Sequence, residues 1–188
     1  MRYTGSMKQQ TKRRIAACAA GFALPRYDEI PSVGLYLDQA VQYVNGHYRS
    51  FPGVALTPSM VSNYVKQGLV NHPIKKKYTR EQLACLTCIA LAKTVLSMEN
   101  IRMLLEMQRA SYPLQVVYDL FCEELELCLS CVFGLRRGLP PLPPDAPDER
   151  LLLRSTILAA SNKLYLDCSF EALQQDQSLW PDILQDLA

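Results

Sequence analysis

One short stretch of this chain carries both a start signal and a stop signal for a helix. Thr57 is a suitable helix cap, Pro58 fits the first helical position because its missing N–H would have no partner there, and Gly68 suits the left-handed conformation that ends helices. The apolar residues between them recur at helical spacing and are expected to face a core: Val61, Tyr64 and Val65. Four polar residues remain on the outer face: Ser59, Ser62, Asn63 and Lys66. Amide, hydroxyl and ammonium groups on one exposed face are what a helix needs to enter the major groove of DNA.

A cationic segment follows this helix. Three consecutive lysines cannot all lie on one buried surface, so residues 75–77 are expected in a solvated turn, and Thr79 is expected to cap the next helix with Gln82 at the capping-box position. The window from Thr57 to Arg80 holds five cations and no acidic residue, a net charge of +5: Lys66, Lys75, Lys76, Lys77 and Arg80. This charge predicts contact with a phosphate backbone. The alternative is a solvated turn that binds nothing.

Three segments together resemble a known family. MVSNYVKQGLV, KKKYT and SMENIRMLLE resemble the winged helix-turn-helix of mercury-resistance-type (MerR-like) transcription regulators. By position, the resemblance implies six DNA contacts, three in the helix and three in the wing: Ser62, Asn63, Lys66, Lys75, Lys76 and Lys77. More narrowly, LT-x-SM-x-x-NYV-x-x-GL followed by KKKY is similar to a bacterial family, domain of unknown function 1836. The resemblance covers about residues 35–108, with a wing shorter than usual and a serine, Ser62, where the regulators commonly have arginine.

The charge of the chain is divided between its two halves. Residues 1–108 hold 14 Lys and Arg against 6 Asp and Glu, whereas residues 109–188 hold 6 against 12, which leaves the overall charge at +2. A basic half followed by an acidic half predicts a DNA-facing module joined to a module with another task. Ordinary uneven surface charge is the alternative.

The chain is expected to divide into three regions. These are an N-terminal extension over residues 1–30, a winged helix-turn-helix domain over 31–108, and a helical dimerisation or effector module over 109–188 with a Pro-rich connector at 134–147. The first helix of the DNA-binding region is expected over about residues 32–45, with Val33 and Tyr36 on its apolar face. In the link that follows, Tyr48 and Arg49 are expected to be loop residues without a role.

The third region contains an unusually apolar helix. It starts after Pro113, extends for about twenty residues, and has an apolar surface wider than one packing stripe, which predicts deep burial or contact with a second chain. Three carboxylates are expected on its solvated face: Glu123, Glu124 and Glu126. Five prolines exclude a helix over 134–147. A last long helix is expected after Pro147, and an apolar segment closes the chain: Leu179, Trp180, Ile183 and Leu184.

The N-terminal residues have the appearance of a signal peptide. Lys12, Arg13 and Arg14 precede the run IAACAAGFAL, but this run is short and rich in alanine, so it is too weakly apolar to span a bilayer. We therefore expect a loosely ordered extension on a soluble, cytoplasmic protein without a membrane partner.

The seven cysteines allow two interpretations. Cys85-x-x-Cys88 and Cys128-x-x-Cys131 have metal-ligand spacing, but each pair lies in an apolar helical run without a knuckle glycine. Cysteine is also a favoured small core residue, so core packing is preferred over a metal or redox site, and no cofactor is expected. The odd count fits a reducing compartment.

These observations favour a binding protein over an enzyme, because no histidine, carboxylate cluster or nucleophile motif meets the geometric requirements of catalysis. We expect an all-α fold: a MerR-like winged helix-turn-helix with a minimal wing, followed by a helical C-terminal module. The expected function is binding of double-stranded DNA by a homodimeric transcriptional regulator, with Ser59, Ser62, Asn63 and Lys66 in the major groove. The alternatives are a helical protein-interaction module that has lost DNA binding, and a regulator that responds to a ligand or metal.

Overall fold

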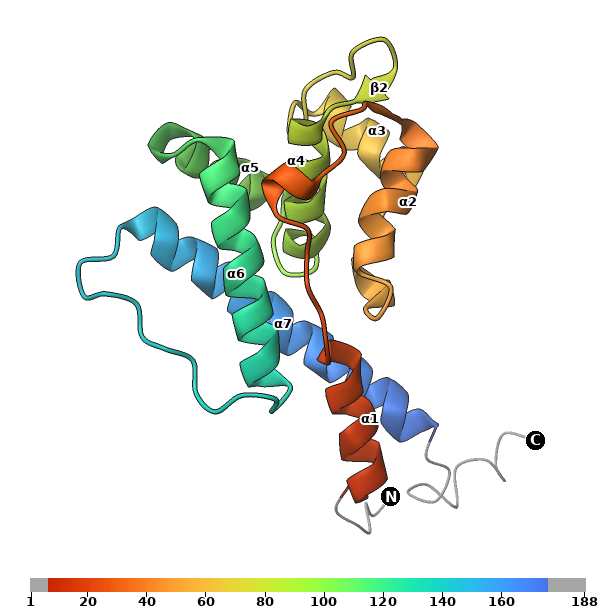
Figure 1. Cartoon of the computed structure of the whole chain (residues 1–188), viewed down its shortest axis with the longest axis vertical. Coiled ribbons are helices and arrows are strands. Elements are labelled where there is room, and N and C mark those ends of the chain that lie inside the picture. Colours follow the sequence, from red (N-terminus) through yellow and green to blue (C-terminus); the bar gives the residue numbers. More distant parts are fainter. Residues whose placement is uncertain (1–6, 176–188) are drawn as a thin grey trace.

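The computed structural model describes residues 7–175, which form a mostly helical fold with one two-stranded sheet (Figure 1). The helices within this part of the chain are α1 (Gln9–Ala19), α2 (Leu37–His47), α3 (Pro58–Lys66), α4 (Arg80–Ala92), α5 (Met98–Ser111), α6 (Leu114–Val132) and α7 (Asp148–Gln174). Short 3-10 turns lie at Tyr27–Glu29 and Pro52–Val54. The expected all-α class is confirmed. The apolar segment that closes the chain, with Trp180, lies outside the described residues.

The sheet joins two segments that are distant in the sequence. Strand β1 (Leu35–Tyr36) pairs antiparallel with β2 (Lys77–Tyr78), so that Leu35 lies opposite Tyr78 and Tyr36 opposite Lys77. The expectation of a helix from residue 32 is therefore wrong at its start. Pairing with β2 extends the backbone before α2 begins, and Val33 and Tyr36 are 69% and 52% exposed instead of lying on an apolar helix face.

The link between α2 and α3 is part of the core. Tyr48 and Phe51 are each 2% exposed, and the Tyr48 hydroxyl donates a hydrogen bond of 3.0 Å to the carbonyl oxygen of Thr87. Tyr48 is thus a structural residue, which corrects the expectation that it has no role. The aromatic side chains of this link anchor the segment that leads into α3.

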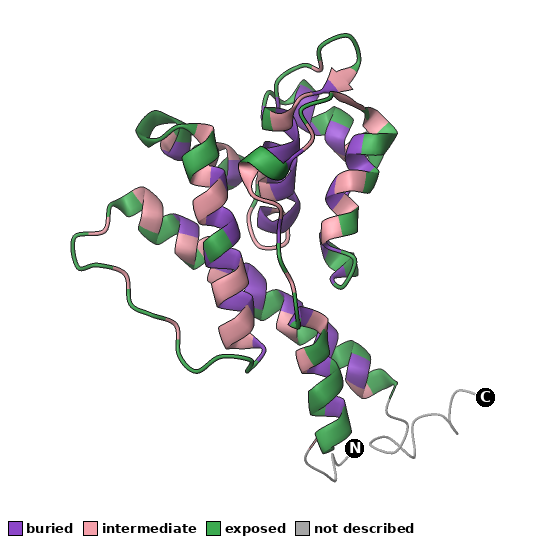
Figure 2. Ribbon diagram, viewed as in Figure 1, coloured by how far each residue is buried: buried purple, intermediate pink, exposed green. Residues whose placement is uncertain are grey.

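Helix α4 lies at the centre of the molecule, and Figure 2 shows it buried along nearly its whole length. It packs against α2, α6 and α7. Six of its residues are 0% exposed: Leu83, Ala84, Leu86, Thr87, Ile89 and Ala90. One continuous hydrophobic core therefore includes residues from both sides of the expected domain boundary at residue 108.

The N-terminal segment is more ordered than expected. Helix α1 packs against α7, and Ile15 and Ala19 are 3% and 4% exposed. These apolar residues recur at helical spacing, so α1 buries one face on the last helix of the described chain. Residues 9–19 are therefore a packed element and not a loose extension.

Helix α6 places two of its three glutamates against arginines. Glu124 is buried and accepts hydrogen bonds of 2.7 Å from both Nε and Nη2 of Arg154. Glu126 accepts bonds of 2.7 and 2.8 Å from Arg26. The expectation of a solvated acidic face holds only for Glu123, which is exposed. A buried carboxylate requires such a charged partner, and here the partners come from other parts of the chain.

Part of the wide apolar face of α6 is covered within the chain. Tyr118, Phe121 and Leu125 are 0%, 3% and 0% exposed, because α4, α5 and α7 pack around the helix. Deep burial, one of the two expected explanations, therefore accounts for these residues, whereas Val116 is 51% exposed. Residues 134–147 form no helix, as their prolines predict. No helix among residues 7–175 has the length and apolar character needed to cross a bilayer.

Candidate nucleic-acid interface

Helix α3 presents a polar face to solvent. Thr57 caps it by accepting a hydrogen bond of 3.2 Å from the backbone N–H of Met60, as predicted. The apolar face is buried at Val61, Tyr64 and Val65. The four residues expected on the outer face are all exposed: Ser59, Ser62, Asn63 and Lys66.

The polar groups of α3 are held only by near neighbours on the same helix. Ser62 Oγ donates to the carbonyl oxygen of Pro58 at 2.9 Å, Ser59 Oγ lies 3.0 Å from Thr57 Oγ1, and Asn63 Oδ1 accepts a bond of 3.3 Å from Gln67 Nε2. Exposed bonds of this kind exchange readily with water or a ligand, since a net hydrogen bond contributes only about 1 kcal/mol. The face is therefore available to an external partner.

The C-terminal end of α3 is fixed from outside the helix. Gly68 has a φ of +74°, and the N–H of Leu69 bonds to the carbonyl oxygen of Tyr64 at 2.9 Å, as in a Schellman motif. Two arginines of α5 hold the same turn. Arg102 donates to the carbonyl oxygen of Gln67 at 2.8 Å, and Arg109 donates to that of Leu69 at 3.3 Å. Nothing in the local sequence pattern predicted these two contacts.

The expected wing is a β-hairpin with a two-residue turn. Ile74 and Lys77 exchange backbone hydrogen bonds of 3.0 and 2.9 Å. Lys75 and Lys76, which form the turn, have φ values of 49° and 65°. This is the geometry of a type I′ turn, which normally selects Asn and Gly because a side chain at positive φ is strained. Both lysines are exposed, and neither forms an ion pair within the described residues.

The last lysine of the run occupies a different environment. Lys77 is half-buried, and its Nζ lies 5.2 Å from the centre of the Tyr36 ring, a cation–π contact across the two strands. Its backbone is also close to the preceding strand, because a Cβ added to Gly34 would lie 2.9 Å from Lys77 Cβ. Lys77 therefore attaches the hairpin to β1 in addition to carrying charge.

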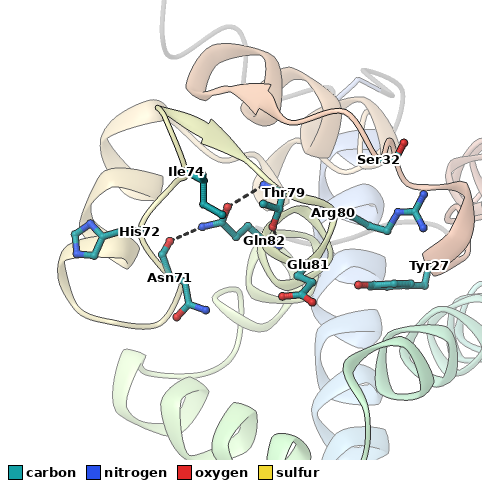
Figure 3. A pocket seen from close by; sticks show the side chains of 9 residues that line it. All are labelled: Tyr27, Ser32, Asn71, His72, Ile74, Thr79, Arg80, Glu81 and Gln82. Carbon is teal, nitrogen blue, oxygen red and sulfur yellow. Dashed lines mark hydrogen bonds between the residues drawn. The ribbon is translucent and has the colours of Figure 1, made fainter.

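Arg80 is directed away from the hairpin turn. Its Nε donates to the carbonyl oxygen of Ile30 at 2.9 Å, one Nη lies 3.3 Å from Asp28, and the guanidinium lies over Tyr27. Figure 3 shows Arg80 beside Tyr27, across the pocket from His72. Arg80 is the first residue of α4, and its partners lie in residues 27–30. A phosphate contact of Arg80, as predicted, would require these bonds to break.

The pocket drawn in Figure 3 separates Arg80 from the hairpin and has a volume of about 470 Å³. Gln82 lies on its wall. Its Oε1 accepts a bond of 2.8 Å from the N–H of Thr79, which confirms the predicted capping box, and its Nε2 donates to the carbonyl oxygen of Asn71 at 2.6 Å. Gln82 thus joins the loop before the hairpin to the start of α4.

The polar face and the hairpin lie at one end of the molecule. Figure 1 places α3, β2 and the adjoining turn together, far from α1 and from the end of α7. The exposed cations of this end are Lys66, Lys75 and Lys76, and residues 57–80 contain no acidic side chain. Burial raises the pKa of Tyr64 and Tyr78, so both phenols remain neutral beneath this surface. The end is therefore polar and positively charged.

The cysteines do not form a second site in this part of the molecule. Cys85 and Cys128 are buried, and burial raises the pKa of the Cys128 thiol to about 11. Within residues 7–175 all seven cysteines are free, and no group of three or more His, Cys, Asp or Glu side chains is placed to hold a metal ion. The two pairs lie on different helices, α4 and α6; Cys85 and Cys128 are core residues, whereas Cys88 and Cys131 are half-buried.

Comparison with known proteins identifies a family. A family model described as "Domain of unknown function (DUF1836)" matches residues 25–121. Neither the curated proteins nor the solved structures gave a significant match. The matched residues include α2 to α5, both strands and the start of α6. Every residue of the polar, cationic end described above lies within the match.

Proposed function

The chain belongs to the DUF1836 family, and we propose that it binds double-stranded DNA as a transcriptional regulator. The observation that supports this proposal is the exposed face of α3 beside two lysines at the tip of a hairpin, within residues 57–80, a stretch that contains no acidic side chain. In this proposal, residues 35–108 form a MerR-like winged helix-turn-helix. Helix α2 is the scaffold helix, α3 the reading helix, and the hairpin at residues 74–77 a minimal wing.

The proposed interface uses contacts to base edges for specificity and contacts to phosphates for affinity. Asn63 can pair with both hydrogen-bonding groups of an adenine once Gln67 releases its side chain, and the serines and Lys66 reach neighbouring base edges or phosphates. Lys75 and Lys76 contact phosphates and contribute affinity without sequence information. Lys77 and Arg80 instead stabilise this part of the fold, Lys77 through its contact with Tyr36 and Arg80 through its hydrogen bond to Ile30.

The proposed regulator acts as a homodimer in the cytoplasm, has no catalytic role, and binds a near-palindromic site. Two reading helices then lie one DNA turn or a multiple apart. The dimer contact is proposed on residues 114–133, which include α6 and where Val116 is 51% exposed.

A gel-shift titration with random duplex DNA tests the proposal. The parent protein should bind at low salt and lose affinity steeply as salt rises. The double variant Lys75→Ala, Lys76→Ala should bind all sequences more weakly, with a log–log salt slope that is shallower by roughly 0.9 for each lost phosphate contact. The control is Arg136→Ala, Arg137→Ala, which removes the same charge from an exposed turn after α6 and should leave binding nearly unchanged. Equal affinity of the lysine variant and the parent would refute the hairpin contact.

One observation favours the alternative of a helical interaction module without DNA binding. Val33, just before β1, and Ile74, at the start of the hairpin, are 69% and 66% exposed, and exposed large apolar side chains favour a protein partner. Such a module should give no salt-dependent shift with any duplex, so the same titration separates the two functions.

A further inference from the structure

Two cysteines that are distant in the sequence meet where α1 packs against α7 (Figure 1). Cys18 lies near the C-terminal end of α1, and Cys168 lies in α7. The Cys18 S–H donates to the carbonyl oxygen of Arg14 at 3.6 Å, so its sulfur accepts the hydrogen bond that joins it to the Cys168 thiol. One turn earlier in α1, the side chain of Arg14 bonds to Gln175 and holds the same two helices together. Both cysteines are free, so the fold places two reduced sulfurs side by side.

The sulfur in α7 is the protected member of the pair. Cys168 is 7% exposed, and burial raises its pKa to about 12, with smaller contributions from Cys18 and from the neighbouring Glu171 and Asp167. Cys168 therefore remains a protonated thiol at neutral pH, and a dissolved oxidant does not reach it first.

The sulfur in α1 is the accessible member. Cys18 is half-buried and lines an open hollow of about 320 Å³ between the turn that follows α1 and the link that follows α2. The lining of this hollow includes one arginine, Arg49, and no carboxylate. Partly exposed cysteines in positively charged surroundings are the ones that react with small oxidants, whereas buried cysteines are inert. The two sulfurs are thus placed as an attacking thiol and a resolving thiol.

We propose that Cys18 and Cys168 are a redox modification site, in which a hydroperoxide converts the two thiols into a disulfide between α1 and α7. The Cys18 sulfur attacks the hydroperoxide, the O–O bond breaks, and Cys18 becomes a sulfenic acid while water or an alcohol leaves. The Cys168 sulfur then attacks the Cys18 sulfur, the S–O bond breaks, and the hydroxyl group leaves as water with the proton of Cys168. The two thiols together lose two electrons, and one hydroperoxide is reduced. Exchange with a small thiol restores both cysteines.

The disulfide controls how firmly α1 is attached to the rest of the fold. Within α1 only Thr11, Ile15 and Ala19 are buried, whereas α4 is buried along nearly its whole length. A helix with so little buried surface opens locally while the core remains folded. In the reduced chain α1 can therefore leave α7, and in the oxidised chain the covalent bond prevents this opening. The inference does not use DNA binding, so it stands independently of the proposed regulator.

Peptide mapping of the full chain tests the pair. The reduced, folded protein is treated with an equimolar amount of hydrogen peroxide, its remaining thiols are blocked with N-ethylmaleimide, and it is digested with trypsin without reduction. Tryptic peptides 15–26 and 164–188 each contain a single cysteine, so a disulfide between Cys18 and Cys168 gives a unique mass. This linked peptide should be the main product, and the free thiols should fall from seven to five, a loss of two. Absence of the linked peptide, or its formation only after unfolding in urea, would overturn the proposal.

Three variants separate the roles of the two sulfurs. In Cys168→Ser the sulfenic acid at Cys18 has no resolving thiol, so dimedone should label it, whereas in Cys18→Ser the buried Cys168 should remain unlabelled. The matched control is Cys131→Ser, at a half-buried cysteine of α6, which should form the linked peptide as the parent does. Labelling of Cys168 in preference to Cys18 would contradict the assigned roles. If a serine variant does not fold, the mapping of the parent protein still decides the question.

Limited proteolysis measures the attachment of α1. Lys12 and Arg13 are exposed trypsin sites within this helix, and a helix must open locally before a protease can cut it. Trypsin should cut the oxidised parent at these sites about tenfold more slowly than the reduced parent. Dithiothreitol should restore the faster rate, and peroxide should leave the rate of Cys18→Ser unchanged. Equal rates for the oxidised and reduced parent would overturn the proposed control of α1.

Discussion

The side-chain amide of Asn45 pairs with both backbone groups of Leu56. Its Nδ2 donates to the carbonyl oxygen at 2.9 Å, and its Oδ1 accepts from the N–H at 2.8 Å. Asn45 lies near the end of α2, and Leu56 immediately precedes Thr57, the cap of α3. A single side chain thus fixes the position at which α3 begins relative to α2.

We expect Asn45→Ala to lower the free energy of unfolding by about 1–3 kcal/mol, because both backbone groups of a buried residue lose their partner. Urea denaturation measures this difference. Gln42→Ala, at an exposed position on the same helix, is the control and should change stability by less than about 0.5 kcal/mol. Equal effects of the two substitutions would show that the pair does not hold the link.

Two glycines, one before β1 and one near the end of α2, should respond to alanine in opposite directions. At Gly34 a Cβ would lie 2.9 Å from Lys77 Cβ, so Gly34→Ala should force the strands apart and destabilise the fold by about 1–3 kcal/mol. At Gly46, inside α2, a Cβ meets nothing within 4 Å, so Gly46→Ala should stabilise by about 0.4–1 kcal/mol. Thermal unfolding of the two variants gives the sign directly. A stabilising Gly34→Ala would contradict the close approach.

In the turn at Lys75 and Lys76, the positive charge is expected to come with a lower free energy of unfolding. Lys76 has a φ of 65°, a conformation that costs a residue other than glycine about 1–2 kcal/mol. Lys76→Gly should therefore raise the free energy of unfolding by up to about 1 kcal/mol, while it weakens DNA binding. Lys77→Gly is the matched comparison and should destabilise, because it removes the contact with Tyr36. Chemical denaturation and the gel shift measure the two effects on the same preparations.

Substitution of Asn63 should change sequence preference more than affinity. Asn63→Ala is expected to remove about 1–3 kcal/mol of discrimination at one base pair, since an amide–adenine pair uses two hydrogen bonds. Selection from a randomised duplex pool, followed by affinities for the four bases at each position, measures this loss. Gln67→Ala removes only the intrahelical partner of Asn63 and should preserve the preference. An unchanged base profile for Asn63→Ala would remove Asn63 from the recognition surface.

His47 should make the fold sensitive to acid. Its ring is partly buried edge-on to Tyr43, and burial lowers the pKa of His47 below its ordinary value of 6.5. His47 in the unfolded chain then binds a proton at a higher pH than His47 in the folded chain. The stability that neutral His47 contributes is therefore complete at pH values above the pKa of His47 in the unfolded chain. It is lost as the pH falls through the lower pKa of His47 in the folded chain. Urea midpoints at about pH 7.5 and about pH 5.5 should differ less for His47→Gln than for the parent.

His72 provides the control for this measurement. It is exposed beside the hairpin, so His72→Gln should retain the acid sensitivity of the parent. If both histidine variants lose stability at low pH as much as the parent does, the sensitivity comes from other groups.

The parts of the fold that the sequence predicted are those set by neighbours a few residues apart. The Thr57 cap, the Thr79–Gln82 capping box and the Gly68 terminus all depend on contacts within one helical turn, so local patterns contain the necessary information. Burial of Glu124 and Glu126 could not be predicted in this way. Their arginine partners are 30 and 100 residues away, and only the assembled fold brings them together.

In the candidate interface, too, features set by nearby residues were predicted and features set by distant residues were not. Exposure of the α3 face follows from helical periodicity and was predicted for all four of its polar residues. The orientation of Lys77 and Arg80 depends instead on Tyr36 and on the connector near Ile30, which lie 41 and 50 residues earlier in the chain. A run of cations in the sequence therefore predicted a charged region but not which of its side chains are free.

The packing of α1 against α7 constrains how the protein is made. The side chains of Arg14 and Gln175, which are 161 positions apart in the sequence, form a hydrogen bond, so α1 meets the helix it packs against only after α7 has left the ribosome. Residues 25–121 can begin to assemble around α4 while synthesis continues. Helix α1 must wait with its apolar face in solvent, and closing such a long loop slows folding. Nascent chains should therefore be most exposed to chaperones and proteases at α1 until α7 has been synthesised.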